Sequence, residues 1–119
     1  MGLRDEQMAF VKDTVKLLIQ AEVLGYEVTF GEVQRTVEMQ QLYVKAGRSK
    51  TMNSQHLKKL AIDLNLFRNG KLCTRDEIKP LGDYWESLHP QNRWGGNWRG
   101  LVDAGKSRFV DAPHFERQA

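Results

Sequence analysis

The stretch LAIDLNLFRNGKLC, residues 60–73, decides the fold class of this chain. Apolar side chains recur at every second position from Leu60, which predicts a β-strand with one strongly apolar face. Asp63 falls on the opposite face from Ile62, so the strand can bury one face and present a carboxylate on the other. Asn69-Gly70 follows and is the strongest short signal for a hairpin turn into a return strand.

Helical and extended patterns precede this hairpin. Residues 5–24 and 32–46 have helical periodicity, and a glycine follows each segment as a helix end. Residues 26–30 alternate and predict a short, half-buried strand. The apolar face of the first helix is expected to consist of Met8, Val11, Val15, Leu18 and Ile19.

A third helix is predicted after the hairpin, ending near Leu88. It begins either with a capping box from Thr74 to Glu77 or with Pro80 in its first turn. Residues 89–105 are rich in Gly, Asn and Trp and predict a loop, and residues 109–116 predict a short final strand broken by a proline.

Composition narrows the class of protein. The 119 residues, with a mass of 13.8 kDa, predict a single domain over 1–119, and 40% hydrophobic residues exclude global disorder. The formal net charge of +3 permits an anionic partner without requiring one. The single Cys73 excludes an internal disulfide. No apolar run is long enough to span a membrane or form a signal-peptide core.

Histidine and aspartate supply the only pattern that carries chemistry. His56 precedes Asp63, and His114 follows Asp111 by three residues. Two imidazoles and one carboxylate form a sound zinc ligand set, and a second carboxylate near a histidine can act as a general base. The spacing alone leaves this open, because each histidine can equally be an ordinary surface or core residue.

Three blocks of the sequence resemble the peptidoglycan zinc peptidases that include D-alanyl-D-alanine carboxypeptidases and L-alanyl-D-glutamate endopeptidases, many of them phage endolysins. The first block runs from Arg35-Thr36 to Gly47-Arg48-Ser49, and the second is Ser54-x-His56 with Ala61-x-Asp63. The third joins Trp94-Gly95-Gly96-Asn97-Trp98 to Asp111-x-x-His114-Phe115. Two positions depart from the family pattern: Lys59 stands for a glycine, which implies strain if its φ is positive, and Asn97 stands for an aspartate.

The resemblance implies a role for each matching residue. His56, Asp63 and His114 would bind Zn²⁺, and Asp111 would be the general base and later the proton donor. Apart from the resemblance, Glu116 is the next residue to test as the base if Asp111 is not. Arg35 would stabilise the oxyanion of the tetrahedral intermediate, and Ser54 would hold the substrate or shape the site. We expect an α+β fold with helices packed on one side of a small, mainly antiparallel sheet and zinc at the open face.

The implied function is zinc-dependent hydrolysis of peptidoglycan stem peptides, in the L-alanyl-D-glutamate bond, by an endolysin-like enzyme. We expect a monomeric catalytic domain without a separate wall-binding domain, made in the bacterial cytoplasm without a signal peptide and acting on the cell wall, with no membrane insertion and no nucleic-acid partner. Three alternatives stay open: a D-alanyl-D-alanine carboxypeptidase, a non-catalytic relative, and a basic nucleic-acid-binding module. The last rests on Lys45, Arg48, Lys50, Lys58 and Lys59.

Overall fold

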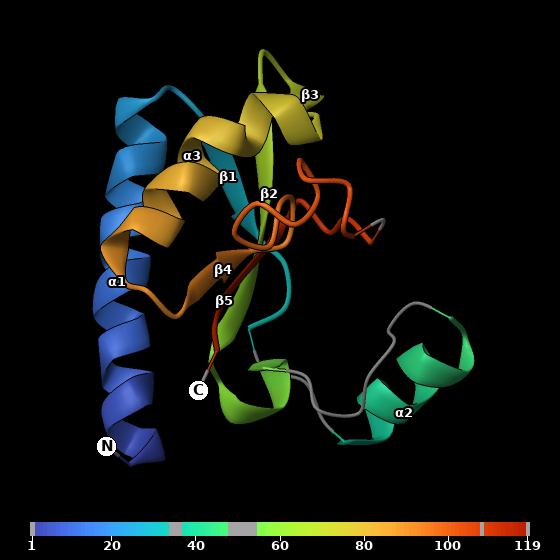
Figure 1. Cartoon of the computed structure of the whole chain (residues 1–119). Coiled ribbons are helices and arrows are strands. Elements are labelled where there is room, and N and C mark those ends of the chain that lie inside the picture. Colours follow the sequence, from blue (N-terminus) through green and yellow to red (C-terminus); the bar gives the residue numbers. More distant parts are fainter. Residues whose placement is uncertain (1, 34–36, 48–54, 108, 119) are drawn as a thin grey trace.

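The computed structural model describes residues 2–33, 37–47, 55–107 and 109–118 (Figure 1). Its centre is an antiparallel sheet in the order β1-β2-β5-β4, with β3 paired to β2 off this path. The strands are β1 (Glu27–Phe30), β2 (Ala61–Arg68), β3 (Lys71–Leu72), β4 (Asn92–Trp94) and β5 (His114–Arg117). The antiparallel sheet with its helices confirms the predicted α+β class.

Two long helices, α1 (Leu3–Val23) and α3 (Arg75–Leu88), share one core with the sheet (Figure 1). Leu64 and Leu66 of β2 and Phe115 of β5 are fully buried in this core. Helix α2 (Val37–Lys45) and the 3₁₀ turn η1 (Gln55–Lys58) lie toward the N-terminal end of β2, away from the β2–β3 hairpin (Figure 1). In the part of the chain that is described, no helix is both long and apolar enough to cross a membrane.

The β2–β3 hairpin confirms the prediction from Asn69-Gly70. Asn69 has φ of 51° and Gly70 has φ of 74°, the two left-handed residues that a type I′ turn requires. Asp63 is half-buried while Ile62 and Leu64 are buried, so the predicted alternation of faces is also confirmed. Lys59, which precedes the strand, has φ of 58°, so this lysine stands in a conformation that favours glycine.

The predicted apolar face of α1 was wrong. Met8, Val11, Val15 and Ile19 are 52–60% exposed, whereas Phe10, Asp13, Leu17 and Ala21 are buried. The reason is an ion pair that periodicity does not reveal. The Asp13 carboxylate lies 2.6 Å from Nη2 of Arg117, which is itself 3% exposed, and this contact holds the face that carries Asp13 with Phe10 and Leu17 against the core.

Several boundaries also differ from prediction. The described helix α2 begins at residue 37 rather than 32, because Glu32 extends beside β2 and accepts a hydrogen bond from the amide of Asp63. The Thr74–Glu77 capping box is present, and Pro80 lies inside α3 rather than in its first turn. Strand β4 lies within the predicted 89–105 loop. The final strand begins only after Pro113, which has no amide hydrogen to donate.

Candidate metal centre

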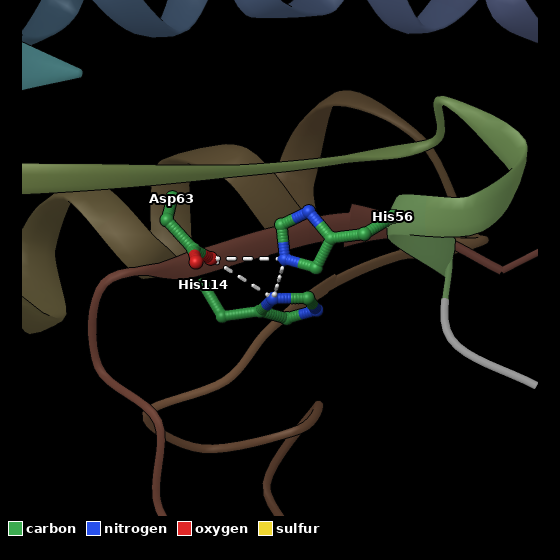
Figure 2. A group of neighbouring side chains, drawn as sticks. All are labelled: His56, Asp63 and His114. Atoms are coloured by element: carbon green, nitrogen blue, oxygen red, sulfur yellow. Dashed lines mark hydrogen bonds and ion pairs between the residues drawn. The ribbon is translucent and has the colours of Figure 1, made fainter. Parts of the chain in front are cut away.

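Three side chains from separate segments meet on the sheet face opposite the helices (Figure 2). His56 projects from η1, Asp63 from the middle of β2, and His114 from the first position of β5. Asp63 and His114 are directly paired in the β2–β5 register, which brings their side chains together on one face. His56 is 1% exposed and His114 6%, so the cluster is nearly closed to solvent on its inner side.

The three facing atoms form a nearly equilateral triangle. His56 Nε2, His114 Nδ1 and Asp63 Oδ1 are each 3.2 Å from the other two (Figure 2). A tetrahedral ion with bonds of about 2.0–2.1 Å spaces its ligand atoms about 3.3 Å apart. The triangle therefore has the dimensions of three ligands around one ion of the size of Zn²⁺.

The outer nitrogens of both imidazoles face hydrogen-bond acceptors. His56 Nδ1 lies 3.3 Å from the carbonyl oxygen of Val33, and His114 Nε2 lies 2.7 Å from Oε1 of Glu116. A carbonyl or carboxylate only accepts, so each outer nitrogen carries the proton. In the neutral imidazoles the inner nitrogens then present lone pairs, which together with the carboxylate form a donor set for a metal ion. Without a metal ion, a proton on His114 Nδ1 can take this place and be donated to Asp63.

Electrostatics favour positive charge at this point. Burial lowers the pKa of His114, but hydrogen bonds to Asp63 and Glu116 outweigh it and raise that pKa to about 9. Burial likewise opposes ionisation of Asp63, but hydrogen bonds from both imidazoles hold the pKa of its carboxyl well below the ordinary value. The site therefore stabilises a bound proton or a metal ion, and the donor set fits the metal.

Two further side chains, Glu116 and Trp98, lie beside the imidazole ring of His114. Glu116 is 8% exposed, and its second oxygen lies 3.5 Å from Nε of Arg93. The ring of Trp98 lies 5.5 Å from that of His114, and the guanidinium of Arg93 stands 4.9 Å over the same indole. Trp98 has φ of 48°, so its loop holds this ring in place at some cost in backbone strain.

The segment Trp94-Gly95-Gly96 packs closely against the residues that precede β5. Trp94 is fully buried, and its indole donates to the carbonyl oxygen of Ala112. A Cβ at Gly95 would lie 2.2 Å from the carbonyl oxygen of Asp111 and 3.0 Å from Cβ of His114. Only glycine lets β4 and the segment before β5 approach this closely, so Gly95 fixes where β5 delivers His114.

Comparison with known proteins gives the family. The model of the phage L-alanyl-D-glutamate peptidase family matches residues 4–117. The chain belongs to this family. It is 36% identical over 106 residues to the L-alanyl-D-glutamate peptidase of Listeria phage A118, covering 85% of this chain and 34% of that protein. The chain thus spans about a third of the length of that relative.

A solved structure supports the fold of this family member. The L-Ala D-Glu endopeptidase ChiX of Serratia marcescens superimposes with a TM-score of 0.65 at 24% sequence identity. The match covers 90% of this chain and 79% of ChiX. At this identity the likeness concerns the fold.

The remaining predicted site residues of this peptidase family member fall in two groups. Asp111 is half-buried, and its backbone is fixed by hydrogen bonds to Gly95 and His114, at the turn that leads into β5. Arg35 and Ser54, together with Arg48, lie outside the described residues. Asn97, at the other departure from the family pattern, donates to the carboxylate of Asp103.

Sequence reasoning missed the role that the structure gives Glu116. It considered this residue only as a substitute base, whereas its carboxylate meets the outer nitrogen of His114, away from the facing atoms. The signal was available: in a strand, positions 114 and 116 lie on the same face. The predicted strand ended at 116 and included Pro113, so this pairing of faces was not recognised. His89, for which the sequence suggested no role, lies at the end of α3, and its Nδ1 accepts a hydrogen bond from the amide of Gln91.

Proposed function

We propose that this protein is a zinc-dependent peptidase that hydrolyses the L-alanyl-D-glutamate bond of bacterial peptidoglycan stem peptides. One observation carries the metal: two imidazole lone pairs and a carboxylate converge at 3.2 Å spacing with their outer nitrogens already engaged. Family membership and the activities named for the phage and Serratia proteins support the substrate. The site of action is therefore the cell wall.

His56, Asp63 and His114 would hold the ion. When bound, zinc polarises an amide carbonyl and activates water near neutral pH, which amide hydrolysis requires. The chain's own part is to present these ligands without rearrangement. The hydrogen bonds of Val33 and Glu116 hold both rings with their inner nitrogens forward, so little reorganisation is needed on binding.

Two charged residues would then act on the substrate. Asp111 takes a proton from the attacking water and returns it to the leaving amine, as a general base and acid. The family resemblance supports this role, and so does the position of Asp111 in the turn directly before His114. Arg35 would stabilise the developing oxyanion, and Ser54 would hold the substrate peptide.

The test combines metal analysis with product identification. The zinc-loaded protein is incubated with purified muropeptides, and the products are identified by mass spectrometry. New amino-terminal D-glutamate is the expected result. Asp111→Asn should keep its zinc and lose about 10²–10⁴-fold in rate, because general acid–base catalysis supplies that much. His89→Ala is the matched control, since this histidine lies in a turn outside the triangle, and it should retain both zinc and activity.

Other outcomes contradict specific parts of the proposal. Release of terminal D-alanine with the L-Ala–D-Glu bond intact would make the protein a carboxypeptidase. Full activity of metal-free protein would remove the zinc from the mechanism. Zinc-loaded protein without any peptide product would exclude the peptidase function and leave a metal-binding, non-catalytic relative.

A further inference from the structure

Exposed apolar residues form a stripe along α1. No other described element lies along the outer side of this helix (Figure 1). Met8 is 52% exposed, Val11 60% and Val15 52%, and Leu18 beside them is half-buried. These residues point away from the buried face that contains Phe10. A stripe of this kind on a surface helix indicates an interaction site rather than scattered exposed residues.

The stripe has the spacing of a coiled-coil seam. Positions 4, 8, 11, 15, 18 and 22 alternate in steps of four and three residues, which is the a/d pattern of a heptad repeat. The four central positions are apolar, while the first is Arg4 and the last is Glu22. The seam is therefore basic at one end and acidic at the other.

The end charges select one pairing. If a second copy of α1 runs antiparallel, Arg4 faces Glu22 of the other copy, Met8 faces Leu18, and Val11 faces Val15. Every layer then joins an a position to a d position, and both end layers join opposite charges. A parallel pair would instead set Arg4 against Arg4 and Glu22 against Glu22, which is repulsive. Lys12 flanks the seam and can keep its ammonium group in solvent.

A hollow beside the seam complements the other copy. Its cavity volume is about 490 Å³, and it is lined by Leu18, Ile19, Glu22, Tyr26, Glu27 and Val28. In the antiparallel pairing, the first turns of the second helix cross this hollow. Met8 of that copy would contact its aliphatic wall, and Arg4 would face its two glutamates. A hollow with both aliphatic and acidic lining residues thus meets one apolar and one basic side chain.

We propose that this protein forms a two-fold symmetric dimer through antiparallel packing of α1 against α1 of a second copy. The triangle of His56, Asp63 and His114 lies on the sheet face opposite α1, so both sites stay open in the dimer. A single helix pair buries less than the roughly 1,600 Å² of a standard interface. The dimer is therefore weak, with a dissociation constant on the order of micromolar, in place of the monomer expected from sequence.

Sedimentation equilibrium over roughly 1–500 μM protein, a range that brackets weak association, tests the proposal. The mass should rise from 13.8 kDa toward twice that value. Val15→Glu should remain at 13.8 kDa at every concentration with an unchanged melting temperature, because Val15 is half exposed in the folded chain. Val23→Glu is the matched control: Val23 is 71% exposed on the same helix but lies outside the seam, so this variant should dimerise normally.

Charge exchange tests the antiparallel direction. Arg4→Glu and Glu22→Arg should each weaken the dimer about fivefold or more, because symmetry repeats each pair twice. The double variant should recover the original affinity. A wild-type protein that stays monomeric throughout, or a dimer that tolerates Val15→Glu, would overturn the proposal. Two weakened single variants without recovery in the double variant would exclude the antiparallel seam.

Discussion

At the scale of single residues, the candidate metal centre depends on groups outside the triangle of facing atoms. Family resemblance predicted His56, Asp63 and His114 as metal ligands, periodicity placed Asp63 on the open face of its strand, and the structure brings these three together. They did not predict the acceptors of the outer nitrogens, because the Val33 carbonyl belongs to the backbone and Glu116 becomes a partner only once the strand register is known. Those acceptors decide which nitrogen of each ring faces the centre of the triangle.

Glu116 should therefore set the metal affinity. Glu116→Ala removes the acceptor at His114 Nε2, so the ring loses its fixed tautomer, and zinc affinity should fall about 10–100-fold. Glu116→Gln can still accept that hydrogen bond through its amide oxygen and should lose less. Competition with a chromophoric chelator measures both affinities, and Glu38→Gln on exposed α2 serves as a control. Equal affinities for Glu116→Ala and wild type would show that His114 is held by other contacts.

The pH dependence of stability should depend on whether metal is present. In metal-free protein the His114 pKa is raised from 6.5 to about 9, so its protonated form adds stability that is complete below about pH 6.5 and lost as pH rises through 9. Asp63 has a lowered pKa, so its contribution is present at neutral pH and lost in acid. Thermal melts of chelator-treated protein between about pH 6 and 9.5 should thus decline with pH. His114→Ala should flatten this decline, and an unchanged slope in that variant would assign it to other groups.

At the scale of elements, turn residues and polar contacts determine where elements end and which face of a helix is buried, in places where the hydrophobic pattern alone does not. The β2–β3 hairpin and the end of α1 at Gly25 were predicted, because turn residues carry their own conformational signal. The face of α1 was not, because Asp13 forms a buried network with Arg117 and Asn92, whereas the apolar stripe stays outside. A helix with apolar residues on both faces gives no periodicity that identifies its inner side.

Asp13 should consequently be a key residue for stability. Asp13→Ala leaves the guanidinium of Arg117 buried without its closest carboxylate, which should destabilise the fold by about 3–5 kcal/mol. Urea unfolding followed by circular dichroism measures the change. Asp5→Ala on the exposed first turn of the same helix is the control and should change stability by less than about 1 kcal/mol. A loss for Asp13→Ala no larger than the control's would mean that solvent or Glu6 compensates the arginine.

At the scale of the whole molecule, the candidate centre is a link between distant parts of the chain. His56 and Asp63 belong to the segment around β2, whereas His114 lies near the end of the chain on β5. The sheet order β1-β2-β5-β4 puts β5 beside β2 although β3, α3 and β4 intervene in sequence. Family resemblance could assign these three residues to one site. It could not predict strand β4 or its place beside β5, because the three residues of β4, Asn92–Trp94, are too few for a periodic signal.

A bound ion should therefore stabilise the whole fold rather than one loop. Ligands on η1, β2 and β5 are assembled only in the folded state, so zinc binds the native protein in preference to the unfolded chain. At free zinc about 1,000-fold above its dissociation constant, the gain in stability should be about 4 kcal/mol. Calorimetry with zinc and with excess chelator measures this gain as a shift in melting temperature. His114→Ala should melt at the same temperature in both conditions, whereas His89→Ala should keep the full shift. A zinc-dependent shift that survives in His114→Ala would place the stabilising ion elsewhere on the protein.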